Sequence, residues 1–161
     1  MRRFGLIVCL TLALVGCENI NKNSVPVYPV RIIIDTKMGP FVHFQPTAIN
    51  TYITVDREGY HYNNNVYPLG VEDAYGYGGV VVFINMLGGY DAYDLACPYC
   101  ALHGKCQPCE IDGFYAICPD CHEQYDLGSG TAVPTQGIGH EFMRRLNLIN
   151  FDGKLTITQQ R

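Results

Sequence analysis

The sequence predicts an all-β fold, an antiparallel sandwich or barrel. Only 16% of its 161 residues are charged and twelve are tyrosines, a composition typical of β-rich secreted proteins. Short apolar or β-branched runs alternate with turns that contain glycine and proline. Helical periodicity is scarce, so we do not expect helices to build the core.

Several segments have the pattern of strands. In residues 49–55, Ile53 and Val55 would lie on one face and Tyr52 and Thr54 on the other. Residues 80–85 (VVVFIN) are an unbroken apolar run, which predicts a strand buried on both faces. The remaining candidates are residues 30–34, 90–97, 113–118, 123–127 and 154–159.

Two other segments have weaker patterns. Residues 140–148 could form one or two helical turns or a strand, and the Asp152-Gly153 pair that follows predicts a hairpin turn. Residues 57–79 are rich in glycine, asparagine and tyrosine and are predicted to form one long surface loop. The glycines at its end do not indicate a phosphate loop, because a strand rather than a helix follows them.

The N-terminus has the pattern of a signal peptide. Arg2 and Arg3 precede an apolar run over residues 4–15, which is shorter than the ~20 residues of a membrane-spanning helix. The run ends in Leu14-Val15-Gly16-Cys17, which resembles the lipobox of bacterial lipoproteins. That resemblance implies cleavage after residue 16, lipidation of Cys17 and attachment to a membrane of the bacterial cell envelope. Glu18, in place of an aspartate, favours the outer membrane over the inner one.

The expected mature chain is a single acidic domain. Removing residues 1–16 deletes two arginines, which leaves nine basic residues against fifteen acidic ones, a net charge of −6. This excess and the absence of basic clusters exclude nucleic acid as a partner. Residues 17–28 are predicted to be a flexible tether, and residues 29–161 one β domain.

The cysteines are concentrated in residues 97–122. Two matched Cys-Pro-x-Cys motifs, Cys97/Cys100 and Cys118/Cys121, begin 21 residues apart, close to the spacing of four-thiolate metal sites. Two intervening residues allow a tight turn to point both sulfurs at one ion, and two such turns complete a tetrahedron. The spacing therefore predicts two facing loops that hold a metal.

The region from residue 90 to 148 resembles the cluster-binding region of Rieske [2Fe–2S] proteins, and more narrowly the Rieske-like lipoproteins of Bacteroidetes-type bacteria. The similarity is carried by Cys118-Pro-Asp-Cys121-His122, by Tyr125-Asp126-Leu127 with Gly130, and by the strand that enters Cys97. It implies an antiparallel Rieske-like sandwich or barrel with a small rubredoxin- or zinc-ribbon-like subdomain that binds the cluster. A [2Fe–2S] cluster is the cofactor that it implies first.

The ligand positions depart from the Rieske pattern of Cys-x-His and Cys-x-x-His. Tyr99 stands where the first histidine is expected, and Cys121 stands where the second is expected, with His122 one place later. Three outcomes are open. Four cysteines could hold a [2Fe–2S] cluster or a single Zn or Fe, His122 or His103 could replace one thiolate, or all six cysteines could form disulfides without a metal.

The inner pair, Cys106 and Cys109, falls outside the matched motifs. The resemblance implies that these two cysteines form a disulfide that stiffens the loop, as a bridge between the two boxes does in Rieske proteins.

The function expected first is one-electron transfer to an unidentified redox partner, rather than catalysis. The alternative is a structural or interaction module of the same fold, stapled by disulfides or zinc. Thiol–disulfide exchange is disfavoured because no helical pattern follows Cys100, Cys109 or Cys121, and no hydrolase motif is present.

Overall fold

Nearly all regular structure in the described part of the chain is antiparallel β-sheet. The structure is a computed structural model that describes residues 23–159, so the predicted signal peptide and Cys17 lie outside the described residues. Every pairing between its named strands is antiparallel. The predicted all-β, antiparallel class is confirmed.

The strands form three sheets. The first sheet has the order β12 (Asn147–Phe151), β13 (Lys154–Thr158), β1 (Val30–Asp35) and β5 (Ala74–Tyr75). The second has the order β4 (Asn65–Tyr67), β3 (Gly59–Tyr62), β2 (Tyr52–Asp56), β6 (Val80–Ile84) and β7 (Tyr90–Asp94). The small third sheet has the order β11 (Val133–Gln136), β10 (Gln124–Asp126), β9 (Tyr115–Ile117) and β8 (Glu110–Asp112).

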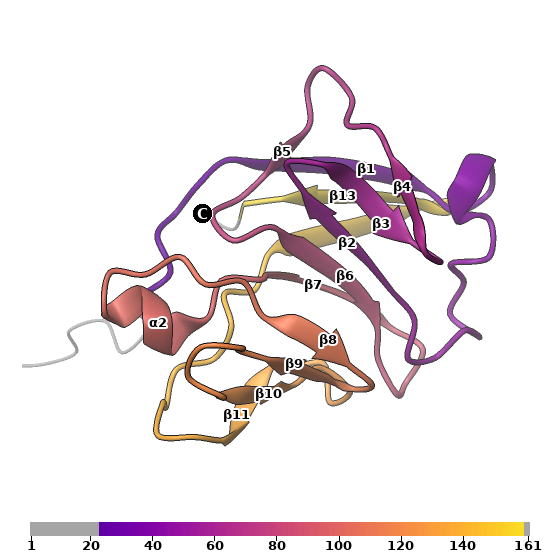
Figure 1. The fold of residues 1–161 in the computed structure, drawn as a ribbon. Helices are drawn as coiled ribbons and strands as arrows, with labels where there is room; N and C mark the ends of the chain where they lie inside the picture. Colours follow the sequence, from indigo (N-terminus) through magenta and orange to yellow (C-terminus); the bar gives the residue numbers. More distant parts are fainter. Residues whose placement is uncertain (1–22, 160–161) are drawn as a thin grey trace, which may run out of the picture.

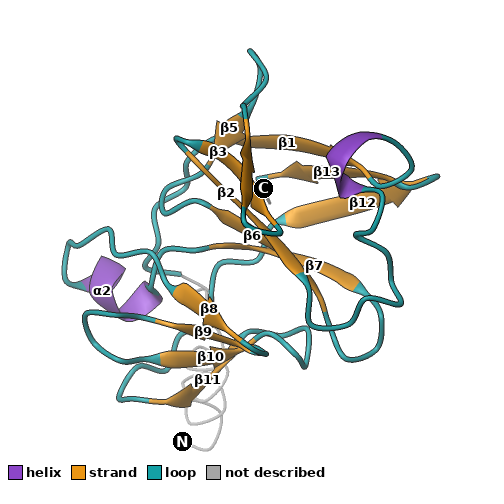
Figure 2. Ribbon diagram, turned by 45° about the vertical axis from the view of Figure 1, so that its right-hand side comes forward, coloured by secondary structure: helices purple, strands orange, loops and turns teal. Residues whose placement is uncertain are grey.

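The first two sheets pack against each other, and the small sheet forms a separate layer. Figure 1 shows β8 to β11 below the larger sheets, with the helix α2 (Pro98–Leu102) beside them. Figure 2 shows the same layers from another side. The predicted arrangement, a β domain with a small subdomain that carries the cysteine loops, is therefore confirmed.

Strand β6 contributes to two cores. Val80, Val82 and Ile84 belong to a base core between the large sheets, together with residues such as Ile34 and Leu155. Val81 and Phe83, on the opposite face, belong to a cysteine core that faces the small sheet and includes Tyr93, Ala116, Tyr125, Leu127, Cys97, Cys100, Cys109 and Cys118. All five residues of β6 are fully buried, as the apolar run predicts.

Two short helices interrupt the strands of the described residues. The 3₁₀ turn η2 (Gly39–Phe41) follows β1, and it buries Phe41. Helix α2 was not expected, because five residues are too few to show a helical period. No helix among the described residues has the length and apolar character needed to cross a membrane.

The prediction of one long surface loop over residues 57–79 is wrong. This segment contains the three strands β3, β4 and β5, which pair in the two large sheets. The alternation of buried and exposed residues is hard to recognise in the sequence of this segment, because Tyr60 and Tyr62 carry polar hydroxyls and yet are buried in the base core.

Two further expectations also need correction. Residues 23–28 of the predicted tether are packed on the domain: Val25 is fully buried, and the Ser24 N–H and hydroxyl both donate to the Glu141 carboxylate at 2.7 Å. Arg144 donates to the Val25 carbonyl.

Residues 140–146 form neither a helix nor a named strand, and β12 begins at Asn147. The hairpin at Asp152-Gly153 is confirmed.

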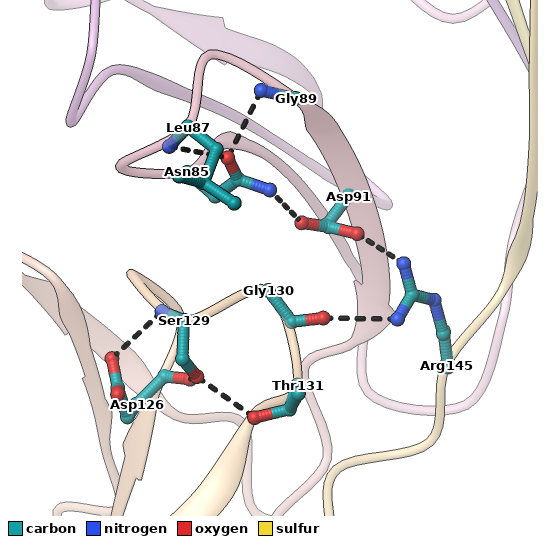
Figure 3. Close-up of polar contacts among 9 residues, drawn as sticks. All are labelled: Asn85, Leu87, Gly89, Asp91, Asp126, Ser129, Gly130, Thr131 and Arg145. Atoms are coloured by element: carbon teal, nitrogen blue, oxygen red, sulfur yellow. Dashed lines mark hydrogen bonds and ion pairs between the residues drawn. The ribbon is translucent and has the colours of Figure 1, made fainter.

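A buried carboxylate joins the second sheet to the loop that follows β10. Figure 3 shows Asp91 of β7 between Asn85 and Arg145, and Arg145 reaching Gly130. Asn85 Nδ2 donates to Asp91 at 2.6 Å, Arg145 forms an ion pair with Asp91, and Arg145 Nη1 donates to the Gly130 carbonyl at 2.9 Å. Since the Asp91 side chain is only 4% exposed, these partners supply the hydrogen bonds that its oxygens would otherwise accept from water.

We predict that Arg145→Met lowers the free energy of unfolding by about 2–4 kcal/mol, because it leaves the buried Asp91 charge without its cation. Arg31→Met is the matched control, since Arg31 pairs with Glu72 on the surface and such pairs contribute ~1 kcal/mol or less. Urea unfolding of both variants measures the difference. Equal, small losses in the two variants would contradict the role given to Arg145.

Candidate metal centre

The first cysteine loop is a single helical turn. Cys97 is the N-cap of α2, Pro98 is its first residue, and the Ala101 N–H donates to the Cys97 carbonyl at 2.9 Å. The turn places Cys97 and Cys100 three positions apart on one side of the helix. The segment before it is held in place because the Ala96 N–H donates to Asp94 Oδ1, and the Cys97 N–H donates to the Gln107 carbonyl.

The second cysteine loop is the turn between β9 and β10. The Cys118 N–H donates to the Glu123 carbonyl, and the His122 N–H donates back to the Cys118 carbonyl, both at 2.9 Å. His122 closes the turn in the left-handed region, at a φ of 59°. Cys118 is thereby buried inside the turn, while Cys121 lies at its partly exposed edge.

The two loops bring four sulfurs together. The Sγ atoms of Cys97, Cys100, Cys118 and Cys121 all lie within 4.8 Å of one another. Cys97 Sγ is 3.6 Å from Cys121 Sγ, and Cys100 Sγ is 3.6 Å from Cys118 Sγ. These four residues are the set expected from the matched motifs, and together they could bind a metal ion or a cluster.

Polar groups surround the sulfurs. The Tyr125 hydroxyl is 3.5 Å from Cys97 Sγ, and Asp120 Oδ2 is 3.9 Å from Cys100 Sγ. Lys105 pairs with Asp120 at 2.9 Å, which connects the two loops at the surface. A hydrogen bond donated to a ligand sulfur, as the Tyr125 hydroxyl could donate to Cys97, tunes the properties of a metal centre.

The electrostatics of the cluster favour a cation. Hydrogen bonding from Cys109, followed by that from Tyr125, lowers the pKa of the Cys97 thiol, whereas burial raises the pKa values of Cys100 and Cys121. The sulfurs of the cluster therefore differ in how readily they lose a proton. A bound metal ion would supply the charge that allows the thiols to ionise together.

The histidines proposed as alternative ligands lie outside this group of four. The His103 ring packs on Tyr99, with centroids 4.6 Å apart, and its Nδ1 contacts the Tyr99 carbonyl at 2.8 Å. His122 is exposed and acts through its backbone in the turn. Among the described residues, neither histidine joins the cysteines in a metal-binding group.

The expected Cys106–Cys109 disulfide is not formed. All six described cysteines are free, so the disulfide-only alternative is not formed either. Cys106 is exposed and its Sγ contacts the Tyr77 carbonyl at 3.2 Å, whereas Cys109 is buried in the cysteine core. The Cys109 N–H donates a hydrogen bond to the Leu95 carbonyl, which directs Cys109 toward the core. The two thiols therefore lie in different surroundings.

Sequence reasoning missed Glu123, which supports the second loop. Glu123 is 1% exposed, and one of its carboxylate oxygens accepts hydrogen bonds from the N–H groups of Ile138 and Gly139 at 2.6 and 2.7 Å. A Cβ at Gly137 would lie 2.2 Å from the same carboxylate, so that position requires glycine. The Gly-Ile-Gly run of residues 137–139 was the available signal.

A surface hollow lies elsewhere. It has a volume of about 580 Å³ and is lined by residues of β2, β3 and β4, including Thr54, His61 and Asn65. None of the cysteines lines it.

Comparison with known proteins finds similarity to solved structures. No protein-family model matches the chain, and no curated protein is significantly similar to it. Among solved structures, a ferredoxin from Sphingomonas yanoikuyae B1 aligns with 72% of this chain and 94% of its own, at 14% identity and a TM-score of 0.41. A similarity at that level carries no conclusion about the function of this chain.

We predict that Cys118→Ser weakens metal binding so far that little metal is retained through purification. Four ligands together contribute about 10–16 kcal/mol in structural sites, so losing one should weaken metal affinity at least ~100-fold. Elemental analysis of protein produced with iron and zinc measures the bound metal per chain. Cys106→Ser is the matched control, because Cys106 lies outside the four, and an equal loss in this control would refute the assignment.

Proposed function

We propose that this protein transfers single electrons through iron bound at the four-cysteine centre. The observation that carries the proposal is the convergence of four sulfurs within 4.8 Å at the ends of two matched loops. Iron held by thiolates, alone or in a [2Fe–2S] cluster, supplies the one-electron chemistry. The resemblance of residues 90–148 to Rieske proteins supports the same function.

The position of the centre suits exchange with a partner protein. Cys97, Cys100 and Cys118 are buried, so their thiolates would be shielded from water and oxidants. Cys121 is partly exposed at the edge of the second loop, with exposed Asp120 and His122 on either side. We propose this edge as the route by which an electron enters and leaves.

The iron-loaded protein is expected to lose its visible thiolate-to-iron absorption on addition of dithionite and to regain it on reoxidation. A zinc-loaded sample is the control, because zinc has no redox chemistry. Spectroscopic titration with one-electron mediators measures the electrons taken up per chain. Iron that binds without reversible reduction, or a wild-type protein that accepts only zinc, would contradict electron transfer.

A structural role for the metal is the second candidate. Strands β8 to β10 are only three residues long, and their core is built partly from the cysteines themselves. A zinc ion could stabilise such a small sheet without any redox function. The identity of the metal in the native protein separates the two functions.

We further propose that a lipid on Cys17 holds the protein at a bacterial membrane surface. The support is the N-terminal pattern of two arginines, an apolar run and the lipobox-like residues 14–17. Asn23 contacts the Phe142 carbonyl, so at most six residue steps separate Cys17 from the packed domain. Six extended steps span about 20 Å, which would keep the domain close to the membrane.

Cys17→Ala is expected to move the protein from the detergent phase to the aqueous phase in detergent partitioning of bacterial cells. Cys9→Ala is the matched control, because Cys9 lies in the segment that cleavage would remove. Detection of the protein in each phase is the measurement. If Cys17→Ala still partitions with the membrane as the wild type does, lipidation at this residue is wrong.

A further inference from the structure

We infer that the four cysteines hold one metal ion rather than a [2Fe–2S] cluster. The inference rests on the proposed function, since it concerns the same centre, but it assigns the number of metal ions that this centre takes. Three observations carry it, namely the spacing of the sulfurs, the way in which they pair and the packing around them.

The spacing matches a single tetrahedron. Metal–sulfur bonds of ~2.3 Å at tetrahedral angles place four sulfurs about 3.8 Å from one another. Two pairs here are separated by 3.6 Å, and no pair by more than 4.8 Å. In a [2Fe–2S] cluster, two irons and their bridging sulfides lie between the thiolate pairs, so sulfurs on different irons lie further apart than the edge of one tetrahedron.

The pairing of the sulfurs points to the same conclusion. In a Rieske cluster the two histidines share one iron, so the first ligands of the two boxes share the other. The equivalent pairs here would be Cys97 with Cys118 and Cys100 with Cys121. Contacts of 3.6 Å nevertheless join Cys97 to Cys121 and Cys100 to Cys118, which a cluster of that kind would place on different irons. The two loops therefore interleave their sulfurs around one centre.

The centre also has little space to expand. Cys97 and Cys118 are fully buried, Cys100 is 3% exposed, and Tyr125 and Cys109 pack against them in the cysteine core. Moving the two pairs apart would require Cys97 and Cys100 to separate within the helical turn of α2, and Cys118 and Cys121 to separate within the β9–β10 turn. The Lys105–Asp120 ion pair spans the same two loops at the surface.

The test is a count of metal and sulfide in the intact protein, purified without oxygen after growth with both iron and zinc. We expect one metal ion per chain and no acid-labile sulfide. A titration of the metal-free protein with Co²⁺ gives an independent readout, and the visible bands of tetrahedral thiolate-bound cobalt should saturate at one ion per chain. Cys106→Ser should give the same stoichiometry, whereas Cys118→Ser should give no such bands.

The outcomes distinguish this inference from the proposed function. Two irons with two sulfides per chain would overturn the single-ion inference and leave electron transfer standing. One zinc ion, with no uptake of iron, would support the inference and overturn electron transfer. A native protein without metal that also fails to bind Co²⁺ would overturn both.

Discussion

The burial of strand β6 on both faces is the constraint on which the rest of the structure depends. Its alternate residues belong to two different cores, so the strand joins the base of the domain to the layer that contains the cysteines. A polar side chain on either face would be left buried without a partner. Strand β7, paired with β6, then leads directly into Cys97, and Asp94 at its end accepts hydrogen bonds from the N–H groups of Tyr77, Gly78 and Ala96. The position of the first cysteine loop thus follows from the packing of β6.

The cysteines also form a large part of the cysteine core, which supports the small sheet. The small sheet has strands of three or four residues and contributes few apolar side chains, so the sulfurs fill space that leucine or valine would fill in a larger domain. Free thiols behave as small apolar groups, which allows this core to pack without a metal. Metal binding would then replace weak contacts between sulfurs by bonds, and part of the binding free energy would become stability of the subdomain.

The sequence predicted the parts of the structure that have a local signal. The apolar run of residues 80–84, the Asp152-Gly153 hairpin and the two Cys-Pro-x-Cys loops each depend on neighbouring residues, and each was found where expected. The packing of residues 23–28 depends on Glu141 and Arg144, which lie more than 110 residues away, and no local pattern encodes such contacts. The strands β3 to β5 were missed because they have two to four residues and bury tyrosines, whose hydroxyls disguise the apolar face. The burial of the Cys109 thiol likewise depends on the hydrogen bond from the Cys109 N–H to the Leu95 carbonyl, which the Cys106-x-x-Cys109 motif does not predict.

The change of ligands from the Rieske pattern and the unexpected helix α2 have one physical explanation. A ligand two positions after Cys97 suits an extended loop, in which residues 97 and 99 point to the same side. A ligand three positions later suits a helical turn, in which residues 97 and 100 share a face. The chain adopts the turn, with Pro98 as its first residue, so Cys100 reaches the centre while Tyr99 packs against His103. This helical turn brings the two sulfurs of the first loop within 4.8 Å of each other and of the sulfurs of the second loop.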